Sequence, residues 1–173
     1  MTVLAWRLYN AVGVNVDRDR ALKLWEQAAQ KGNRRAMTRL GMPRSHEELA
    51  TWEYSIQQDH LKQASSKGDT LALIGLGWSY LGQGAKNKSS ALASWTTAAT
   101  QNSVLGMMVL SLSYKEGMLT DTDPAKSEYW AEHAIAVANG PKVVLEIEDY
   151  YAVGFIYANA VGVAPNPSKA YAW

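Results

Sequence analysis

Two kinds of apolar stretch alternate along the chain, and both have the spacing of an α-helix. The first kind has small or apolar residues separated by four, one and three positions, for example Ala72, Leu76, Gly77 and Tyr80. The second kind has separations of four, three and one, for example Ala21, Trp25, Ala28 and Ala29. Such spacings place side chains on one face of a helix, and no stretch alternates as a strand would. The pattern therefore predicts an all-α protein made of helix pairs.

The pair of stretches recurs along the sequence with a regular period. Gly32 and Gly68 lie 36 residues apart, and the motif Gly-Val-x-x-Asp at residues 13–17 returns as Gly-Val-x-x-Asn at residues 162–166. A fixed period is typical of repeat proteins, in which each unit buries its apolar face against its neighbours. The period divides the chain into approximate repeats at residues 1–35, 36–71, 72–105, 106–148 and an incomplete 149–173.

The joints between the stretches contain residues that start and stop helices. Asp123 and Asn166 are each followed by proline, which predicts an N-cap side chain and a proline at the first helical position. Asp17 occupies the equivalent place in the first repeat. Gly32 and Gly68 stand where a C-terminal cap needs a positive φ. Each repeat is therefore predicted to be a helix, a short loop containing glycine, a second helix and a turn.

These residues resemble the Sel1-like repeat family, a relative of the tetratricopeptide repeats. The first repeat is similar to the family pattern from residue 4 to residue 32, with Leu8 in the position of the usual tyrosine and Ala11 in that of the first glycine. The last repeat is similar to it from residue 153 to residue 170. The third and fourth repeats keep fewer of the pattern's residues, namely Leu76, Gly77, Tyr80, Gly84, Trp95, Ala98, Ala99, Leu110, Tyr114, Gly117, Asp123 and Ala134.

The resemblance implies an α-solenoid in which antiparallel helix pairs stack into a right-handed superhelix. The first helix of each pair would then line the concave face. It also implies a non-enzymatic scaffold or adaptor that binds a protein or peptide on that face, as in bacterial envelope, secretion and signalling assemblies. The alternative is a bacterial immunity protein that inhibits a secreted toxin, such as a lipase-type effector of the type VI system. A remote alternative is a β-lactam-hydrolysing enzyme, an activity linked to cysteine-rich members of the family.

Composition removes most catalytic chemistry from consideration. The chain has no cysteine, its three histidines are scattered, and its net charge is +1. No phosphate-binding motif follows Gly84, and no Ser-x-x-Lys stands in a convincing setting. We therefore expect no catalytic, cofactor-binding or metal-binding residue. The charge gives no general attraction to nucleic acid or membranes, and the apolar runs are too short to cross a bilayer.

The second repeat departs from the pattern after Gly41. Pro43 ends its first helix early, and Ser45 with Glu48 predicts a capping box for a long helix that runs to about Ser66. Two interpretations stay open for this helix. It presents Trp52 or Tyr54 to a partner, or it is a degenerate repeat that buries Trp52 in the core.

Positive charge is concentrated beside this helix. Five basic residues occur between Glu26 and Glu47 with no acidic residue among them, namely Lys31, Arg34, Arg35, Arg39 and Arg44. Arg35 and Arg39 are four positions apart and share a helix face. They form either a patch for an acidic protein partner or a solvated face paired with the glutamates of the following helix, Glu47, Glu48 or Glu53.

The position directly after Leu-Gly is large and apolar in every repeat, holding Trp6, Met42, Trp78, Leu112 and Phe155. These side chains form either an aromatic groove on the first helices or part of the core. The predicted partner-binding residues are therefore Arg35, Arg39, Met42, Trp52, Trp78, Leu112 and Phe155. Both ends of the chain look cut within a repeat, so the lack of a signal peptide leaves bacterial cytoplasm and periplasm open. The oligomeric state and the partner stay open as well.

Overall fold

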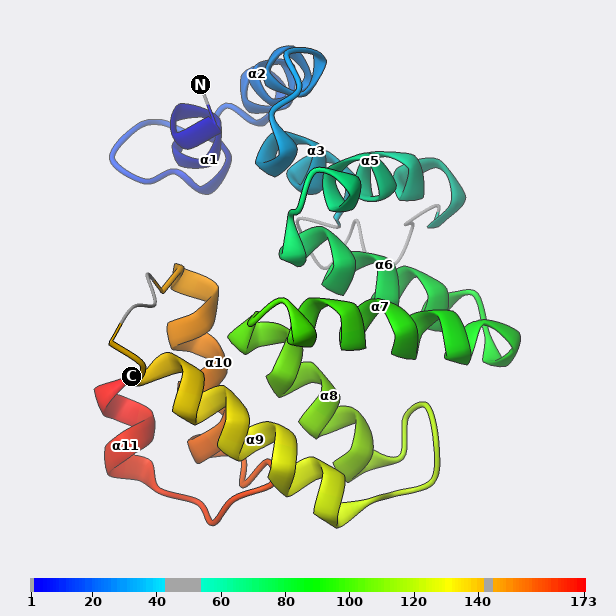
Figure 1. Cartoon of the computed structure of the whole chain (residues 1–173). Helices are drawn as coiled ribbons and strands as arrows, with labels where there is room; N and C mark the ends of the chain where they lie inside the picture. The colour runs from blue at the N-terminus through cyan, green and yellow to red at the C-terminus, as the bar shows by residue number, and fades with distance from the viewer. Residues whose placement is uncertain (1, 43–53, 142–144) are drawn as a thin grey trace. The chain divides into compact units, whose positions relative to one another are not determined.

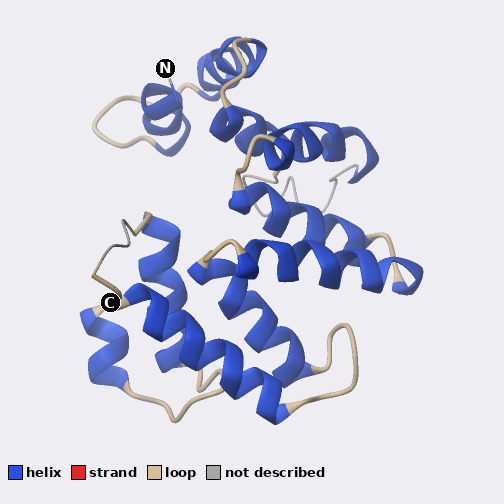
Figure 2. Cartoon of the chain, viewed as in Figure 1, coloured by secondary structure: helices blue, strands red, loops and turns tan. Residues whose placement is uncertain are grey.

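The computed structural model describes residues 2–42, 54–141 and 145–173, and for residues 54–57 it describes the backbone alone. Within these ranges the chain forms ten α-helices, one short 3₁₀ helix and no strand (Figure 2). The prediction of an all-α fold is confirmed.

The helices alternate between the two kinds of stretch seen in the sequence (Figure 1). We call the first helix of each repeat an A helix and the second a B helix. The A helices are α1 (Thr2–Asn10), α3 (Arg34–Gly41), α6 (Thr70–Gly82), α8 (Val104–Glu116) and α10 (Ile147–Ala158). The B helices are α2 (Arg18–Gln30), α5 (Tyr54–Ser66), α7 (Lys88–Thr100), α9 (Pro124–Ala138) and α11 (Pro167–Ala172), and the 3₁₀ helix η1 (Ala85–Asn87) precedes α7.

The predicted long helix of the second repeat ends at Ser66, as expected. Its predicted start, with Pro43, Ser45, Glu48 and Trp52, lies outside the described residues.

The predicted caps hold the B helices at their N-termini. Asp17 accepts a hydrogen bond from the Arg20 amide, Asp123 from the Lys126 amide and Asn166 from the Lys169 amide, at 2.9, 3.0 and 3.0 Å. Gly32 and Gly68 have φ angles of 81° and 78°, as the C-terminal cap requires. These helix ends are therefore fixed by local sequence.

One backbone hydrogen bond closes the loop between the A and B helices in the same way in three repeats. The N-cap amide of the B helix donates to the carbonyl nine residues earlier: Asp17 to Leu8, Asp123 to Tyr114 and Asn166 to Tyr157, at 3.0, 2.9 and 2.9 Å. This bond sets a residue-by-residue correspondence between the first, fourth and fifth repeats.

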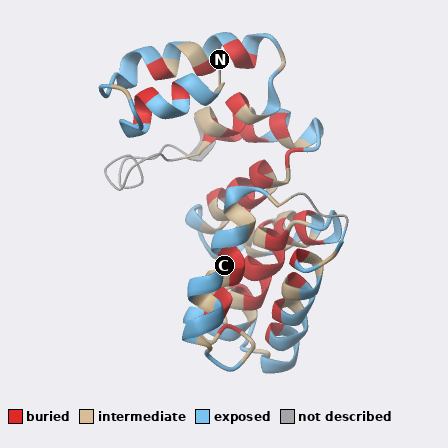
Figure 3. Ribbon diagram, turned by 90° about the vertical axis from the view of Figure 1, so that its left-hand side faces the viewer, coloured by how far each residue is buried: buried red, intermediate tan, exposed pale blue. Residues whose placement is uncertain are grey.

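The chain divides into two compact units, Met1–Gly82 and Gln83–Trp173, which we call the N-terminal and C-terminal units. In the N-terminal unit α3 packs against α2, α5 and α6; in the C-terminal unit α8 packs against α7, α9 and α10. Buried residues form stripes along the helices (Figure 3). Trp25 and Trp95, which occupy the same position of the B helix, are 1% and 0% exposed, so each unit has its own core.

Small residues allow the helices to approach closely. A Cβ added at Gly106 of α8 would lie 3.0 Å from the Cβ of Ala98 on α7, and one added at Gly154 of α10 would lie 3.3 Å from the Ala170 carbonyl on α11. The backbones of α10 and α11 therefore approach closely at Gly154.

Candidate functional site

Two neighbouring A helices of the N-terminal unit carry most of the predicted partner-binding residues. Helix α3 holds Arg35 and Arg39, Met42 follows it directly, and α6 holds Trp78. The two helices contact each other. All four side chains are half-buried, so each has part of its surface against the protein and part open to solvent.

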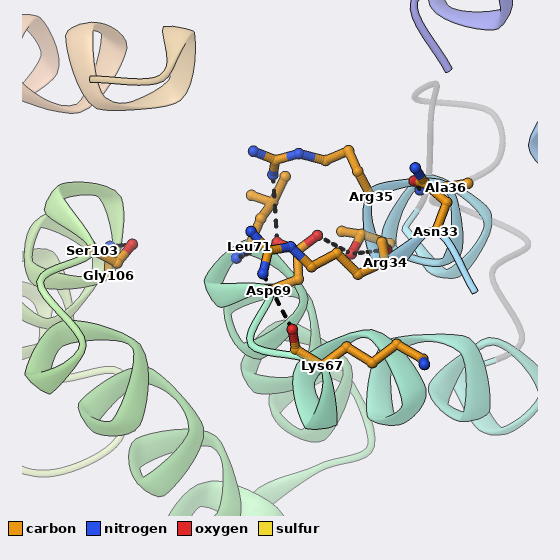
Figure 4. A network of polar contacts seen from close by, with 10 residues as sticks. Asn33, Arg34, Arg35, Ala36, Lys67, Asp69, Leu71, Ser103 and Gly106 are labelled. Atoms are coloured by element: carbon orange, nitrogen blue, oxygen red, sulfur yellow. Dashed lines mark hydrogen bonds and ion pairs between the residues drawn. The ribbon is translucent and has the colours of Figure 1, made fainter. Parts of the chain in front are cut away.

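A buried carboxylate holds α3 against α6 (Figure 4). Asp69, 4% exposed, accepts from the Leu71 amide at the start of α6 and from the Thr38 hydroxyl of α3, at 3.1 and 2.9 Å. The Leu71 amide donates to Oδ1 of Asp69 and the Thr38 hydroxyl to Oδ2. The Arg35 Nη1 atom also lies 3.5 Å from Oδ1. A buried charge needs a partner and hydrogen bonds, and Asp69 has both. Arg35 therefore has a structural contact as well as an exposed part.

The neighbouring arginine also stabilises the corner between α5 and α6. Arg34 Nη1 donates to the Lys67 carbonyl at 3.2 Å, at the turn that precedes α6 (Figure 4). The sequence suggested that the basic run pairs with Glu47, Glu48 or Glu53, and these three residues lie outside the described part of the chain. Asp69 was not predicted as a site residue, although its place directly after the capping Gly68 marks it as the N-cap of α6.

The large residues after the leucine of the A helices lie between core and solvent. Met42 reaches α6, where its Cγ would lie 3.1 Å from a Cβ added at Gly75. Trp78, Leu112 and Phe155 are half-buried. Leu112 and Phe155 belong to the C-terminal unit, on α8 and α10, which contact each other. Trp52 lies outside the described residues.

An exposed apolar face on α10 was not predicted. Ile147, Tyr150 and Tyr151 are 74%, 46% and 62% exposed. Their counterparts on α8, which are the equivalent positions of the fourth repeat, are all buried: Val104, Met107 and Met108. All six residues are large and apolar, so the neighbouring elements decide which of the two sets is covered.

Asp149 lies within this part of α10 and interrupts its apolar character. It accepts a hydrogen bond from the Glu146 amide at 3.0 Å and so closes the capping box of α10. Burial raises the pKa of the Asp149 carboxyl above its ordinary value. Hydrogen bonds from backbone amides lower this pKa, and the negative charge of Glu148 raises it, each by less than burial does.

A metal site and a membrane span each place structural requirements on the described residues. No group of three or more His, Asp or Glu side chains in them is placed to hold a metal ion. In the same ranges, no helix has the length and apolar character needed to span a membrane.

Capped helix pairs that repeat the same loop-closing bond define a helical repeat protein. The sequence profile of the Sel1 repeat matches residues 1–33, 104–136 and 147–173, together more than half of the chain. The protein therefore belongs to the Sel1 repeat family. No curated protein matches its sequence.

Two solved structures share this fold. The crystal structure of a Sel1 repeat protein from Oxalobacter formigenes has a TM-score of 0.69 and 18% identity, covering 99% of this chain and 67% of that one. A protective antigen of uropathogenic Escherichia coli strains, which displays an SLR fold, has a TM-score of 0.64 and 19% identity, covering 99% of this chain and 36% of that one. The chain thus spans about two thirds and one third of these structures. Sel1 repeat proteins are generally scaffolds for protein interactions, and their fold is typically non-catalytic.

Proposed function

We propose that this protein is a non-enzymatic scaffold that binds a protein or peptide on its A helices. The main contact region is the surface formed by Arg39 and Trp78 on α3 and α6 of the N-terminal unit. The observation that carries the proposal is that a cation and an indole, both half-buried, stand on two helices in direct contact. Arginine and tryptophan are the side chains most often found at the energetic centre of interfaces.

The Asp69 network supports this choice of surface. It ties Thr38 and Arg35 of α3 to the first turn of α6. Binding costs less free energy when the contacting elements are already ordered. A surface on α3 and α6 therefore has an advantage over one on a less restrained part of the chain.

The charge of α3 favours an acidic partner. Residues 31–42 contain four basic side chains and no acidic one. Asp69 lies beside Arg35 and offsets part of this charge. A positive surface steers an acidic partner and raises the association rate, an effect that salt screens.

The experiment is to capture a partner from the source organism's lysate, purify it and measure its affinity for the variant Arg39→Glu. We expect binding to weaken about tenfold or more at about 0.01 M salt, and the difference to shrink at about 1 M salt, where the Debye length is about 3 Å. The matched control is Lys23→Glu, an equal charge change at an exposed residue of the B helix α2. Arg39→Glu binding with wild-type affinity at low salt would refute this surface.

The same measurement separates the two roles that the family resemblance implies. A scaffold binds several partners with modest affinity, whereas an immunity protein binds one toxin tightly in a 1:1 complex.

A further inference from the structure

The correspondence between repeats shows that Leu8 stands where two other repeats have a tyrosine. Leu8, Tyr114 and Tyr157 each accept the loop-closing hydrogen bond from the N-cap amide nine residues later. The three side chains therefore leave the A helix at the same point, facing the first turn of the B helix.

In the two repeats with a tyrosine, a lysine covers its ring. Lys126 Nζ lies 5.1 Å from the centroid of the Tyr114 ring, and Lys169 Nζ lies 5.2 Å from that of Tyr157. Both distances are within the range of a cation–π interaction. Each lysine is three residues after its N-cap, so the cap places the cation above the ring.

The first repeat has a cation at the third position after the N-cap but no tyrosine at position 8; its own cation–π contact is formed by the neighbouring residues, with the Arg18 guanidinium carbon 5.4 Å from the centroid of the Tyr9 ring. Arg20 is three residues after the N-cap Asp17, as Lys126 and Lys169 are after theirs, and it donates its amide to Asp17 in the same way. Leu8 is too short to reach the space that a tyrosine ring occupies. The adjacent Tyr9 does not fill it, because its ring packs in the core at 5.5 Å from that of Trp25.

An open hollow borders Leu8 at this place. Its volume is about 770 Å³, and it lies between the end of α1 and the first turn of α2. Leu4, Leu8 and Val14 provide apolar wall, and Asp17 and Arg20 provide the polar rim. We call these five residues the tyrosine slot.

We propose that the tyrosine slot binds an aromatic side chain, tyrosine above all, from a partner protein. The ring lies on Leu4 and Val14, above the buried Leu8 and beneath the Arg20 guanidinium, which stacks on aromatic faces more readily than a lysine does. The phenol oxygen stays at the polar rim. The ligand chemistry follows from the chain itself, because its own tyrosines occupy the equivalent space in the fourth and fifth repeats. This proposal rests on the proposed function in one respect, namely that a partner protein supplies the aromatic side chain.

The first test uses p-cresol, the side chain of tyrosine as a free molecule, in an NMR titration of the full chain. We expect saturable shifts confined to residues 4–20, with a dissociation constant of about 1 mM for so small a ligand. The matched probe 4-methylcyclohexanol has a similar size and a hydroxyl but no aromatic face. Shifts outside the slot, or equal affinity for the two probes, would overturn the aromatic site.

The variant Leu8→Tyr supplies the missing ring from within the chain. We expect it to weaken p-cresol binding at least about tenfold and to raise the melting temperature by about 2–4 °C. Arg20→Gln, at an exposed position, keeps the fold and should weaken binding of p-cresol but not of the cyclohexanol. Undiminished p-cresol binding in both variants would contradict the site.

A further experiment uses the partner protein that is captured from the lysate and measured against Arg39→Glu. Leu8→Tyr should weaken that complex while leaving its salt dependence unchanged, since no charge is altered. A partner that binds Leu8→Tyr as well as wild type would overturn the proposed source of the ring. That result would leave the Arg39 surface standing, whereas failure of the Arg39→Glu test alone would count against the proposed function.

Discussion

At the scale of single residues, the structure explains why equivalent positions differ between repeats. Ala131 of α9 occupies the position of Trp25 and Trp95 and is fully buried. The space of the absent indole is taken by the loop of the fifth repeat: a Cβ added at Gly162 would lie 2.9 Å from the Ala131 Cβ and would overlap the Ser127 carbonyl. A small residue in one repeat is thus matched by a glycine in the next.

Gly162→Ala should therefore be much more destabilising than Gly13→Ala. The two glycines are equivalent and have φ angles of 67° and 68°. Alanine costs about 1–2 kcal/mol at either position because of the left-handed backbone. At Gly162 overpacking adds about 1–3 kcal/mol, whereas a Cβ at Gly13 meets only the flexible end of Arg7. Urea unfolding gives both values, and equal losses would show that the loop does not pack on α9.

The sequence predicted most single-residue conformations that depend on near neighbours. The caps at Asp17, Asp123 and Asn166 and the positive φ of Gly32 follow from a few adjacent residues. The hollow beside Leu8 was not predicted, although the sequence shows leucine at the tyrosine position. Whether a smaller side chain leaves a hollow depends on what the surrounding elements place there, which spacing alone does not contain.

At the scale of elements, Asp69 joins two helices that the sequence treats as separate. Thr38 and Asp69 are 31 positions apart, on α3 and at the start of α6, so no local pattern links them. The same limit applies to α8 and α10, whose apolar stripes read alike while one is buried and the other is exposed. Neighbouring residues in the sequence determine where a helix begins and ends, whereas contacts between helices depend on how the helices pack.

Asp69→Ala should accordingly cost more stability than Asp17→Ala. Loss of the exposed N-cap Asp17 removes one capping bond, about 1 kcal/mol. Loss of Asp69 removes the cap of α6 and leaves the Thr38 hydroxyl and the half-buried Arg35 without this partner, about 3–5 kcal/mol in total. Thermal or urea unfolding measures the two. Equal losses would mean that the contact between α3 and α6 does not depend on Asp69.

At the scale of the whole molecule, the chain is an all-α Sel1 repeat protein with two compact units and a core in each. Family and fold class were predictable because the period survives in spite of substitutions at single positions. The candidate surface was predictable only in part: Arg35, Arg39, Met42 and Trp78 share one unit, while Leu112 and Phe155 belong to the other. The sequence could not show that Arg35 is partly committed to a buried carboxylate.

The central claim is that a partner protein binds the A helices of the N-terminal unit. The most direct test is amide hydrogen exchange of the full chain with and without the captured partner, since a ligand slows exchange where it suppresses local opening. We predict slower exchange in α3 and α6, residues 34–41 and 70–82, with the B helices α7 and α9 unchanged. Protection confined to the B helices, with α3 and α6 exchanging as in the free protein, would contradict the account.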